Sequence, residues 1–296
     1  MLPGVVFVAA RRNGANLLAL AGRSRAGGAG WCYLAGVGHP AHPIHPTPPD
    51  AIRRETFLRH LDAPLRPNLV ALRAGSASLH RHWWGGQPDA ERNWDLCVSV
   101  YDGDPEAIGQ GADYLAHQPE QRKFQAIFDL LHPGSPLLSY DRVWMPDDDL
   151  LISLGDINRM FHLSRIHGLD LAQLALRPGP DCFISHPITE RQPDSLLRYV
   201  GFVEIMCPLF SARALRICLP SLRDAWSGHG LDFLWPALLG GPRARIAIID
   251  ARTLIHTRPI GRSYDIGAAR HEWESTPASY HSCPVTMPEL RVPPPR

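Results

Sequence analysis

One stretch constrains the fold of this chain more than any other. The segment 140–145, which ends in the apolar residues Val143-Trp144-Met145, is followed after Pro146 by three consecutive aspartates at 147–149. Neighbouring carboxylates repel one another, and a cation bound among them relieves the repulsion. Hard oxygen ligands suit Mg²⁺ or Mn²⁺, and Mg²⁺ commonly combines one or two protein carboxylates with phosphate oxygens of a substrate. An apolar strand that ends in such a cluster predicts a metal site at its carboxyl end.

The spacing within the triplet assigns a role to each member. Asp147 and Asp149 have the Asp-x-Asp spacing with which sugar-nucleotide transferases hold a metal against a diphosphate, and we predict them as metal ligands. Asp148 is expected to point toward the ribose of a nucleotide or to hold structure. The alternative for the whole triplet is an acidic turn with a helix N-cap, because Asp is a common capping residue.

The segments before the triplet predict the class of the fold. Residues 69–73 and 94–101 have the composition of short buried strands, and apolar residues at helical spacing predict a helix over 121–132. Strand, helix and strand joined by short turns imply parallel pairing with right-handed crossovers. We therefore expect an α/β fold with a mixed, mainly parallel sheet flanked by helices.

Three polar strand ends are expected to meet at one edge of this sheet, where ligands of open α/β sheets bind. Arg73 ends the first strand, Asp102 the second, and the aspartate triplet the third. We predict that Arg73 and Asp102 contact the base, ribose or phosphate of a nucleotide, with Asp102 as a simple turn residue the alternative. Lys123 is a further candidate for phosphate, or a solvated charge on its helix.

Composition excludes several classes of function. The formal net charge of the 296 residues is +1, so no strong field attracts nucleic acid or an anionic membrane. No apolar run approaches the roughly 20 residues that cross a bilayer. The six cysteines are scattered without a C-x-x-C pair, which indicates reduced thiols. We expect a cytoplasmic protein without a membrane span or a nucleic-acid partner.

The chain divides into three regions by composition. Residues 1–66 contain a Gly/Ala/Arg stretch and a run of Pro and His over 39–49, and we expect a disordered Pro/Gly/His-rich arm because Pro blocks regular structure. The three histidines of that run are a second candidate for metal binding. Residues 67–262 are expected to form the folded domain. Residues 263–296 are expected to be a polar extension that packs loosely.

An ordered set of motifs resembles a glycosyltransferase-like family of plants and bacteria that is catalogued mainly as a domain of unknown function. The motifs lie at residues 93–103, 123–124, 140–149, 186–189, 202–210, 228–233, 249–250 and 256. Together they span roughly residues 68–261. The resemblance implies a GT-A-like fold, the fold of nucleotide-diphospho-sugar transferases. One departure is His229, where the family tends to have an aromatic residue, and this affects the expected contacts to the acceptor.

The resemblance also implies roles for three later residues. GT-A enzymes often place a late histidine on the metal, and His256 has that position, although a lone His is commonly structural. Asp232 is the candidate base that takes the proton of an acceptor hydroxyl, or simply an acid that favours a helix N-terminus. Glu204 lies in an apolar run and either contacts the acceptor, stabilises a cation-like sugar, or faces water. Whether the sugar is inverted or retained stays open.

We therefore predict a metal-dependent glycosyltransferase that moves a sugar from a nucleoside diphosphate sugar to a hydroxyl acceptor, expected to be a glycan. Asp147, Asp149 and His256 would hold Mn²⁺ or Mg²⁺, and Asp232 and Glu204 would be catalytic. Arg73, Asp102, Lys123 and Asp148 would bind the donor nucleotide. The alternatives are a non-catalytic carbohydrate- or nucleotide-binding protein and a metal-dependent phosphohydrolase or nucleotidyltransferase. The latter is weakened because no G-x-x-x-x-G-K-[ST] motif is present.

Overall fold

The structure is a computed structural model that describes residues 6–12, 15–21, 31–34, 57–85, 91–259, 265–275 and 291–293. The chain divides into two compact units, Met1–Ala51 and Ile52–Arg296. The boundary separates most of the predicted arm from the predicted domain, and each unit is considered by itself below.

The first unit contains a three-stranded antiparallel sheet of β1 (Val6–Arg12), β2 (Ala15–Ala21) and β3 (Trp31–Leu34). The sequence-based expectation placed no strand here. The register pairs Arg12 with Ala15, which leaves two residues between the strands. In the sequence these two positions are Asn13-Gly14, a dipeptide that favours two-residue hairpin connections. The Pro- and His-rich run over 39–49 lies outside the described residues.

The second unit is built on one mixed sheet, in the strand order β14-β11-β13-β10-β12-β8-β5-β6-β7-β4, with β9 paired to β13. The long ladders β5–β6 and β10–β13 are parallel, as are β5–β8 and β6–β7. Shorter antiparallel pairs extend and link them. The strands are β4 (Phe57–Arg59), β5 (Asn68–Ala74), β6 (Trp94–Val100), β7 (Tyr114–His117), β8 (Arg142–Trp144), β9 (Leu150–Leu151), β10 (Leu171–Leu176), β11 (Leu197–Tyr199), β12 (Leu209–Ser211), β13 (Ile246–His256) and β14 (Arg291–Val292).

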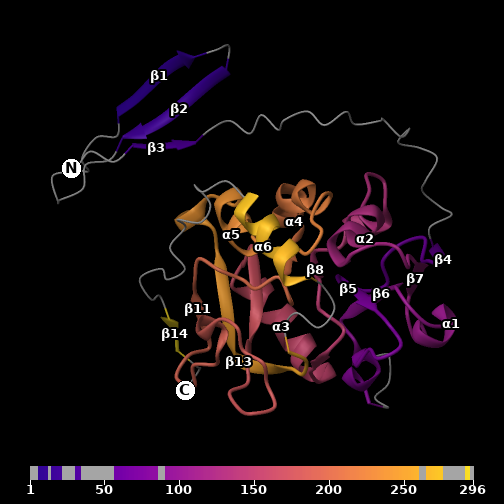
Figure 1. Cartoon of the computed structure of the whole chain (residues 1–296). Coiled ribbons are helices and arrows are strands. Elements are labelled where there is room, and N and C mark those ends of the chain that lie inside the picture. The colour runs from indigo at the N-terminus through magenta and orange to yellow at the C-terminus, as the bar shows by residue number, and fades with distance from the viewer. Residues whose placement is uncertain are drawn as a thin grey trace. The chain divides into compact units, whose positions relative to one another are not determined.

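Helices flank the sheet on both faces (Figure 1). They are α1 (Pro105–Ile108), α2 (Lys123–Leu130), α3 (Leu154–Ile166), α4 (Ala212–Cys218), α5 (Leu231–Leu238) and α6 (Ile266–Ser275). Short 3₁₀ turns lie at His80–Trp83, Pro136–Ser139, Pro187–Thr189, Leu219–Leu222 and Gly241–Arg243. The predicted mixed α/β sheet with flanking helices is confirmed.

Side chains of the central strand β5 alternate between two hydrophobic clusters. Val70 and Leu72 belong to the cluster that includes α3, whereas Leu69 and Ala71 belong to the cluster that includes α2, α4 and α5. Successive side chains of a strand point to opposite faces, so β5 is buried on both sides. This is why its sequence is an almost continuous apolar run.

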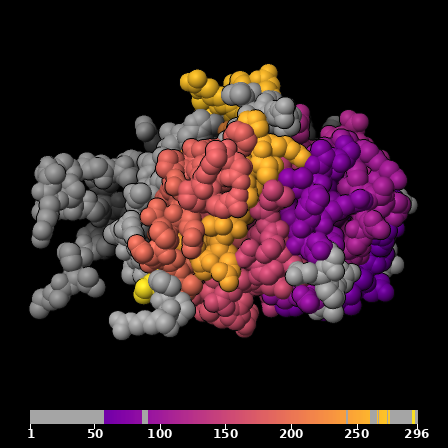
Figure 2. Space-filling view, turned by 90° about the horizontal axis from the view of Figure 1, so that it is seen from below, coloured from indigo at the N-terminus to yellow at the C-terminus, as the bar shows by residue number. Residues whose placement is uncertain are grey.

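The strand order separates the early part of the domain from the later part. In the space-filling view of Figure 2, early segments in indigo and magenta and later segments in orange lie on opposite sides of the face seen from below. Strands β8 and β12 lie between these two parts in the sheet. The aspartate triplet follows β8, so it lies where the two parts meet.

Two segments differ from what their composition suggests. The apolar run over residues 199–210 is not one continuous strand, because β11 ends at Tyr199 and β12 begins at Leu209. Gly201 and Pro208 interrupt the apolar run between them, and neither favours a strand interior. The described parts of the C-terminal extension belong to the domain: β14 pairs with β11, and Glu272 of α6 accepts hydrogen bonds from the backbone of Trp226 and Ser227.

Candidate active site

A cleft of about 1040 Å³ opens at the edge of the sheet where β5, β6 and β8 end. Among its lining residues are most of the predicted site residues, from segments far apart in the sequence. These are Arg73, Lys123, Asp147, Asp148, Asp149, Glu204, Asp232 and His256. Of the predicted set, Asp102 alone does not line it. The expectation that polar strand ends converge is therefore met by the geometry of the first and third strands.

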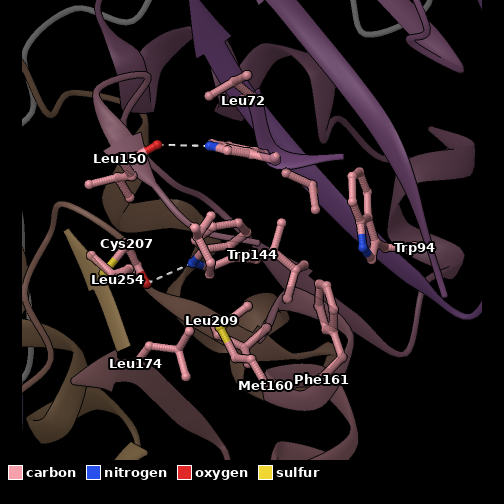
Figure 3. Packing of buried hydrophobic residues seen from close by; sticks show 14 of the residues in the cluster. Leu72, Trp94, Trp144, Leu150, Met160, Phe161, Leu174, Cys207, Leu209 and Leu254 are labelled. Atoms are coloured by element: carbon pink, nitrogen blue, oxygen red, sulfur yellow. Dashed lines mark hydrogen bonds between the residues drawn. The ribbon is translucent and has the colours of Figure 1, made fainter. Parts of the chain in front are cut away.

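The backbone of the triplet is fixed by the segment that precedes β12. The amide of Met145 donates to the carbonyl of Pro208 at 2.9 Å, and that of Asp147 to Met206 at 2.8 Å. Below it, the indole of Trp144 donates to the Cys207 carbonyl at 3.0 Å (Figure 3). Another indole, that of Trp83, donates to the Leu150 carbonyl at 2.8 Å. The backbone that carries the three carboxylates is therefore held by hydrogen bonds and by buried tryptophans.

Asp147 forms an ion pair with Lys123, whose Nζ lies 2.6 Å from Oδ1. The same ammonium donates to the carbonyls of Ile205 at 2.9 Å and Met206 at 3.0 Å. Lys123 is the only lysine in the chain, which otherwise uses arginine. An ammonium is a compact charge with three donors, and here all three have an acceptor.

Asp148 is engaged on both carboxylate oxygens. Its Oδ2 accepts from the amide of Gly75 at 3.0 Å and from the hydroxyl of Tyr101 at 2.9 Å, and its Oδ1 pairs with Arg258 at 3.0 Å. Burial raises the pKa of Asp148, and these donors act in the opposite direction. The contacts favour the structural alternative for Asp148, because they join three strand ends.

Asp149 faces His256, with 3.4 Å between Oδ2 and the imidazole Nε2. Strand β9 pairs with the end of β13, and this pairing brings the two residues together. The other ring nitrogen, Nδ1, lies 3.1 Å from the carbonyl of Phe183. Burial lowers the pKa of His256, but the hydrogen bond to Asp149 and the charges of Asp149 and Asp147 outweigh it, so the net direction is upward.

The donor set fits a divalent cation in part. Within residues 57–85 and 91–259, no three side chains of His, Cys, Asp or Glu converge on one point, because Asp147 is turned to Lys123. Asp149 and His256 do converge, and Oδ1 of Asp149 is buried without a hydrogen-bond partner. A buried unpaired carboxylate oxygen beside an imidazole suits a hard metal whose remaining ligands are phosphate oxygens and water.

A second group of side chains that lines the cleft contains the two buried acids Glu204 and Asp232. Asp232 lies in the first turn of α5, as predicted, and its Oδ1 accepts from the amide of Phe233 at 3.1 Å. The pKa of Asp232 is raised to about 7, chiefly by burial; the charge of His186 acts to lower this pKa and the charge of Glu204 acts to raise it. The segment before α5 packs closely on α2: a side chain at Gly228 would overlap with the ring of Phe124.

Arg73 and Asp102 have structural partners. The guanidinium of Arg73 donates to Ser99 Oγ at 2.7 Å and to the carbonyls of Gln118 and Gln121, so it holds the loop before α2 while lining the cleft. Burial lowers the pKa of Arg73 to about 10. The exposed Asp102 accepts from the amide and the hydroxyl of Ser76, which matches its alternative as a turn residue.

Three cleft residues were not singled out from the sequence: Tyr101, His186 and Arg258. Tyr101 and Arg258 hold Asp148, and each follows a strand end that was already of interest. Nδ1 of His186 lies 3.3 Å from Oε1 of Glu204. His186 lies in one of the quoted motifs, next to Pro187, but a lone histidine gave no signal of its partner.

Comparisons with known proteins give a fold-level likeness only. The sequence matches no family model and no curated protein. A crystal structure of residues 1–349 of S. aureus TarS with UDP is similar at 11% identity and a TM-score of 0.42, over 63% of this chain and 59% of that one. The same protein with UDP-GlcNAc is similar at 10% identity and a TM-score of 0.40, over 63% and 57%. The likeness thus spans less than two thirds of either chain.

No helix within the described part of the chain has the length and apolarity that a bilayer crossing requires.

Proposed function

We propose that this chain is a metal-dependent glycosyltransferase on a GT-A-like fold, which moves a sugar from a nucleoside diphosphate sugar to a hydroxyl acceptor. The observation that carries the proposal is that one cleft is lined by two different groups of acidic side chains, which we call its two walls. One wall holds the Asp149–His256 pair with its unpaired carboxylate oxygen, and the other holds the buried acids Glu204 and Asp232. Sugar transfer from a nucleoside diphosphate sugar needs both groups, because one binds the diphosphate and the other takes the proton of the acceptor hydroxyl.

On the donor wall, Asp149 and His256 would hold Mn²⁺ or Mg²⁺. The metal would neutralise charge that develops on the diphosphate as it leaves. Lys123 and Arg258 stand next to this pair, on Asp147 and Asp148, and both are cations that can turn to phosphate oxygens. Arg73 keeps the loop before α2 in place beside them.

On the acceptor wall, Asp232 would act as the base. A pKa of about 7 is well matched to proton transfer near neutral pH. As the acceptor oxygen bonds to the anomeric carbon, its proton would pass to the carboxylate of Asp232. The bond from the anomeric carbon to the diphosphate oxygen would break with its electron pair, releasing the nucleoside diphosphate. A direct displacement of this kind would invert the configuration at the anomeric carbon. In this scheme Glu204 would bind the acceptor.

The first test is thermal stability with UDP, GDP and CMP derivatives, each with Mn²⁺ and with EDTA. A ligand that binds only the folded state raises the Tm by mass action. The proposal expects one nucleotide to raise the Tm with Mn²⁺ and not with EDTA. Asp149→Ala should abolish the shift. Asp102→Asn is the matched control, because Asp102 ends a neighbouring strand outside the cleft, and its shift should equal that of the parent.

Absence of a shift with every nucleotide, in a folded sample, would overturn the donor assignment. A metal-dependent shift without release of nucleotide from its sugar derivative would instead favour the non-catalytic binding protein.

A further inference from the structure

The imidazole of His186 stands in the acceptor half of the cleft and has no part in the roles described above. Its Nδ1 lies 3.3 Å from Oε1 of Glu204. An ionised carboxylate has no hydrogen to give, so Nδ1 donates. The side chain of His186 is 42% exposed and that of Glu204 is 6% exposed. Both residues line the cleft, and the histidine is the more exposed of the two.

Three contacts fix the position of this imidazole. The carbonyl of His186 accepts from both the amide and the hydroxyl of the buried Thr189, at 2.9 Å and 2.7 Å. Its ring packs on Phe202 with 4.7 Å between centroids, and Phe202 in turn packs on Phe233 at 5.3 Å. Phe233 follows Asp232 in α5, so the aromatic contacts join His186 to the helix of the candidate base.

Glu204 is left with one unused oxygen. Its Oε1 pairs with His186, whereas its Oε2 is buried and has no hydrogen-bond partner. The backbone of Glu204 is also fixed, since its amide donates to the side-chain oxygen of Gln173 at 2.6 Å. Buried polar atoms are nearly always satisfied, and one that lines a cleft points to a ligand that donates a hydrogen bond.

We propose that His186 is a positioning residue for the acceptor: it holds Glu204 by Oε1, so that Oε2 accepts a hydrogen bond from an acceptor hydroxyl beside the one that reacts at Asp232. This inference rests on the proposed function for the identity of the reaction. It also defines the class of acceptor. Two buried carboxylates suit a neutral group with neighbouring hydroxyls, as in a sugar or another polyol, and repel a phosphate or carboxylate at this position.

The charges around His186 act in one direction. The hydrogen bond to Glu204 raises the pKa of His186, burial opposes this, and the charges of Glu204 and Asp232 add to the rise. His229, which precedes α5, carries little charge near neutral pH because burial lowers its pKa. Lys123 lies on the far side of Glu204, bound to the carbonyl of Ile205. A protonated His186 therefore stands between two acids and favours the ionised form of Asp232.

The test follows the imidazole resonances of His186 by NMR as the pH is raised, with His186→Asn used to assign them. In Glu204→Gln the titration midpoint of His186 should fall, because the anionic partner is gone. Glu190→Gln is the matched control, four residues along the same segment and outside the cleft, and should leave the midpoint in place. An unchanged midpoint in Glu204→Gln would overturn the inference.

A second arm asks whether His186 acts on Asp232. The carboxyl resonance of Asp232 should titrate at higher pH in His186→Asn than in the parent, because Asn can replace the hydrogen bond from Nδ1 but not the charge. An equal midpoint would contradict the inference. Neither arm requires transfer activity or a nucleotide. A response of both resonances without any nucleotide-dependent Tm shift would uphold the coupling of His186 to Glu204 and Asp232 but reject the transferase. A nucleotide-dependent Tm shift without a response of either resonance would uphold the donor site but reject the role of His186.

Discussion

The two walls of the cleft treat their carboxylates differently. On the donor wall each aspartate faces its own basic side chain: Asp147 faces Lys123, Asp148 faces Arg258 and Asp149 faces His256. On the acceptor wall two buried acids, Glu204 and Asp232, share the single imidazole of His186.

This difference indicates which wall is expected to bind charged groups and which is expected to transfer protons. A wall whose charges are already paired can exchange one partner for another, such as a metal or a phosphate group, without creating an isolated buried charge. On the acceptor wall, burial raises the pKa of Asp232 to about 7, and a carboxyl with such a pKa can accept and release a proton near neutral pH. The donor wall is thus suited to binding, and the acceptor wall to proton transfer.

The largest effect is expected at Asp232. In Asp232→Asn the side chain keeps its shape but cannot take a proton, so the transfer rate should fall by about 10²- to 10⁴-fold. The metal-dependent Tm shift with nucleotide should persist, because Asp232 belongs to the other wall. Nucleotide release from the sugar derivative measures the rate. A variant that retains the parent rate would show that Asp232 is not the base.

The same substitution should stabilise the protein at high pH. The pKa of Asp232 is raised from 3.8 to about 7, so its stabilising contribution is complete below about pH 4 and is lost as the pH rises through 7. Asparagine resembles the protonated acid at every pH. Asp232→Asn should therefore exceed the parent by on the order of 2–4 kcal/mol in free energy of unfolding at pH 8. Urea unfolding at pH 5 and pH 8 tests this, and a pH-independent difference would refute it.

On the donor wall, removal of a cation should destabilise. Lys123→Met leaves Asp147 and two carbonyl groups without their donor. We expect a loss of about 1–3 kcal/mol, less than for a fully buried pair, because the side chain of Asp147 is 39% exposed. Lys123→Arg keeps the charge, but a planar guanidinium does not match three acceptors placed around a point. Denaturant unfolding should therefore rank the parent above Lys123→Arg, and equal stability of all three would mean that the ammonium is not needed.

The smallest effect is expected outside both walls. Asp102→Asn weakens the hydrogen bonds to Ser76 in an exposed turn, and we expect a loss of at most about 1 kcal/mol. Nucleotide binding should not change. If the Tm shift with nucleotide disappeared in this variant, the donor wall would extend further than the cleft described here, and the original assignment of Asp102 to the nucleotide would be restored.

Local sequence signals were sufficient for much of the fold. Residues 69–73 lie in a strand, as predicted, because an almost continuous apolar run of that length fits a strand buried on both faces. Ser153 precedes α3 and caps it, since its Oγ accepts from the amide of Asp156, and Ser with Asp three residues on is a local signal for a helix start. The position of the triplet after β8 followed from the same reasoning, because a polar cluster cannot continue a buried strand.

Contacts between distant segments were beyond such signals. The pairing of β9 with β13, which brings His256 to Asp149, joins residues more than a hundred positions apart. The partner of Glu204 could not be deduced either, because the apolar run around it resembles a strand and His186 lies in another segment. Lys123 was predicted in the site, but its ion pair with Asp147 was not, and that pair changes the expected set of metal ligands.

Lys123 also links the two walls mechanically. Its ammonium holds Asp147 on one side and the carbonyls of Ile205 and Met206, directly after Glu204, on the other. A donor phosphate that draws Lys123 away would release the backbone next to the acceptor acid. We therefore expect an ordered kinetic scheme in which the sugar nucleotide binds first and the acceptor second, with product nucleotide leaving last.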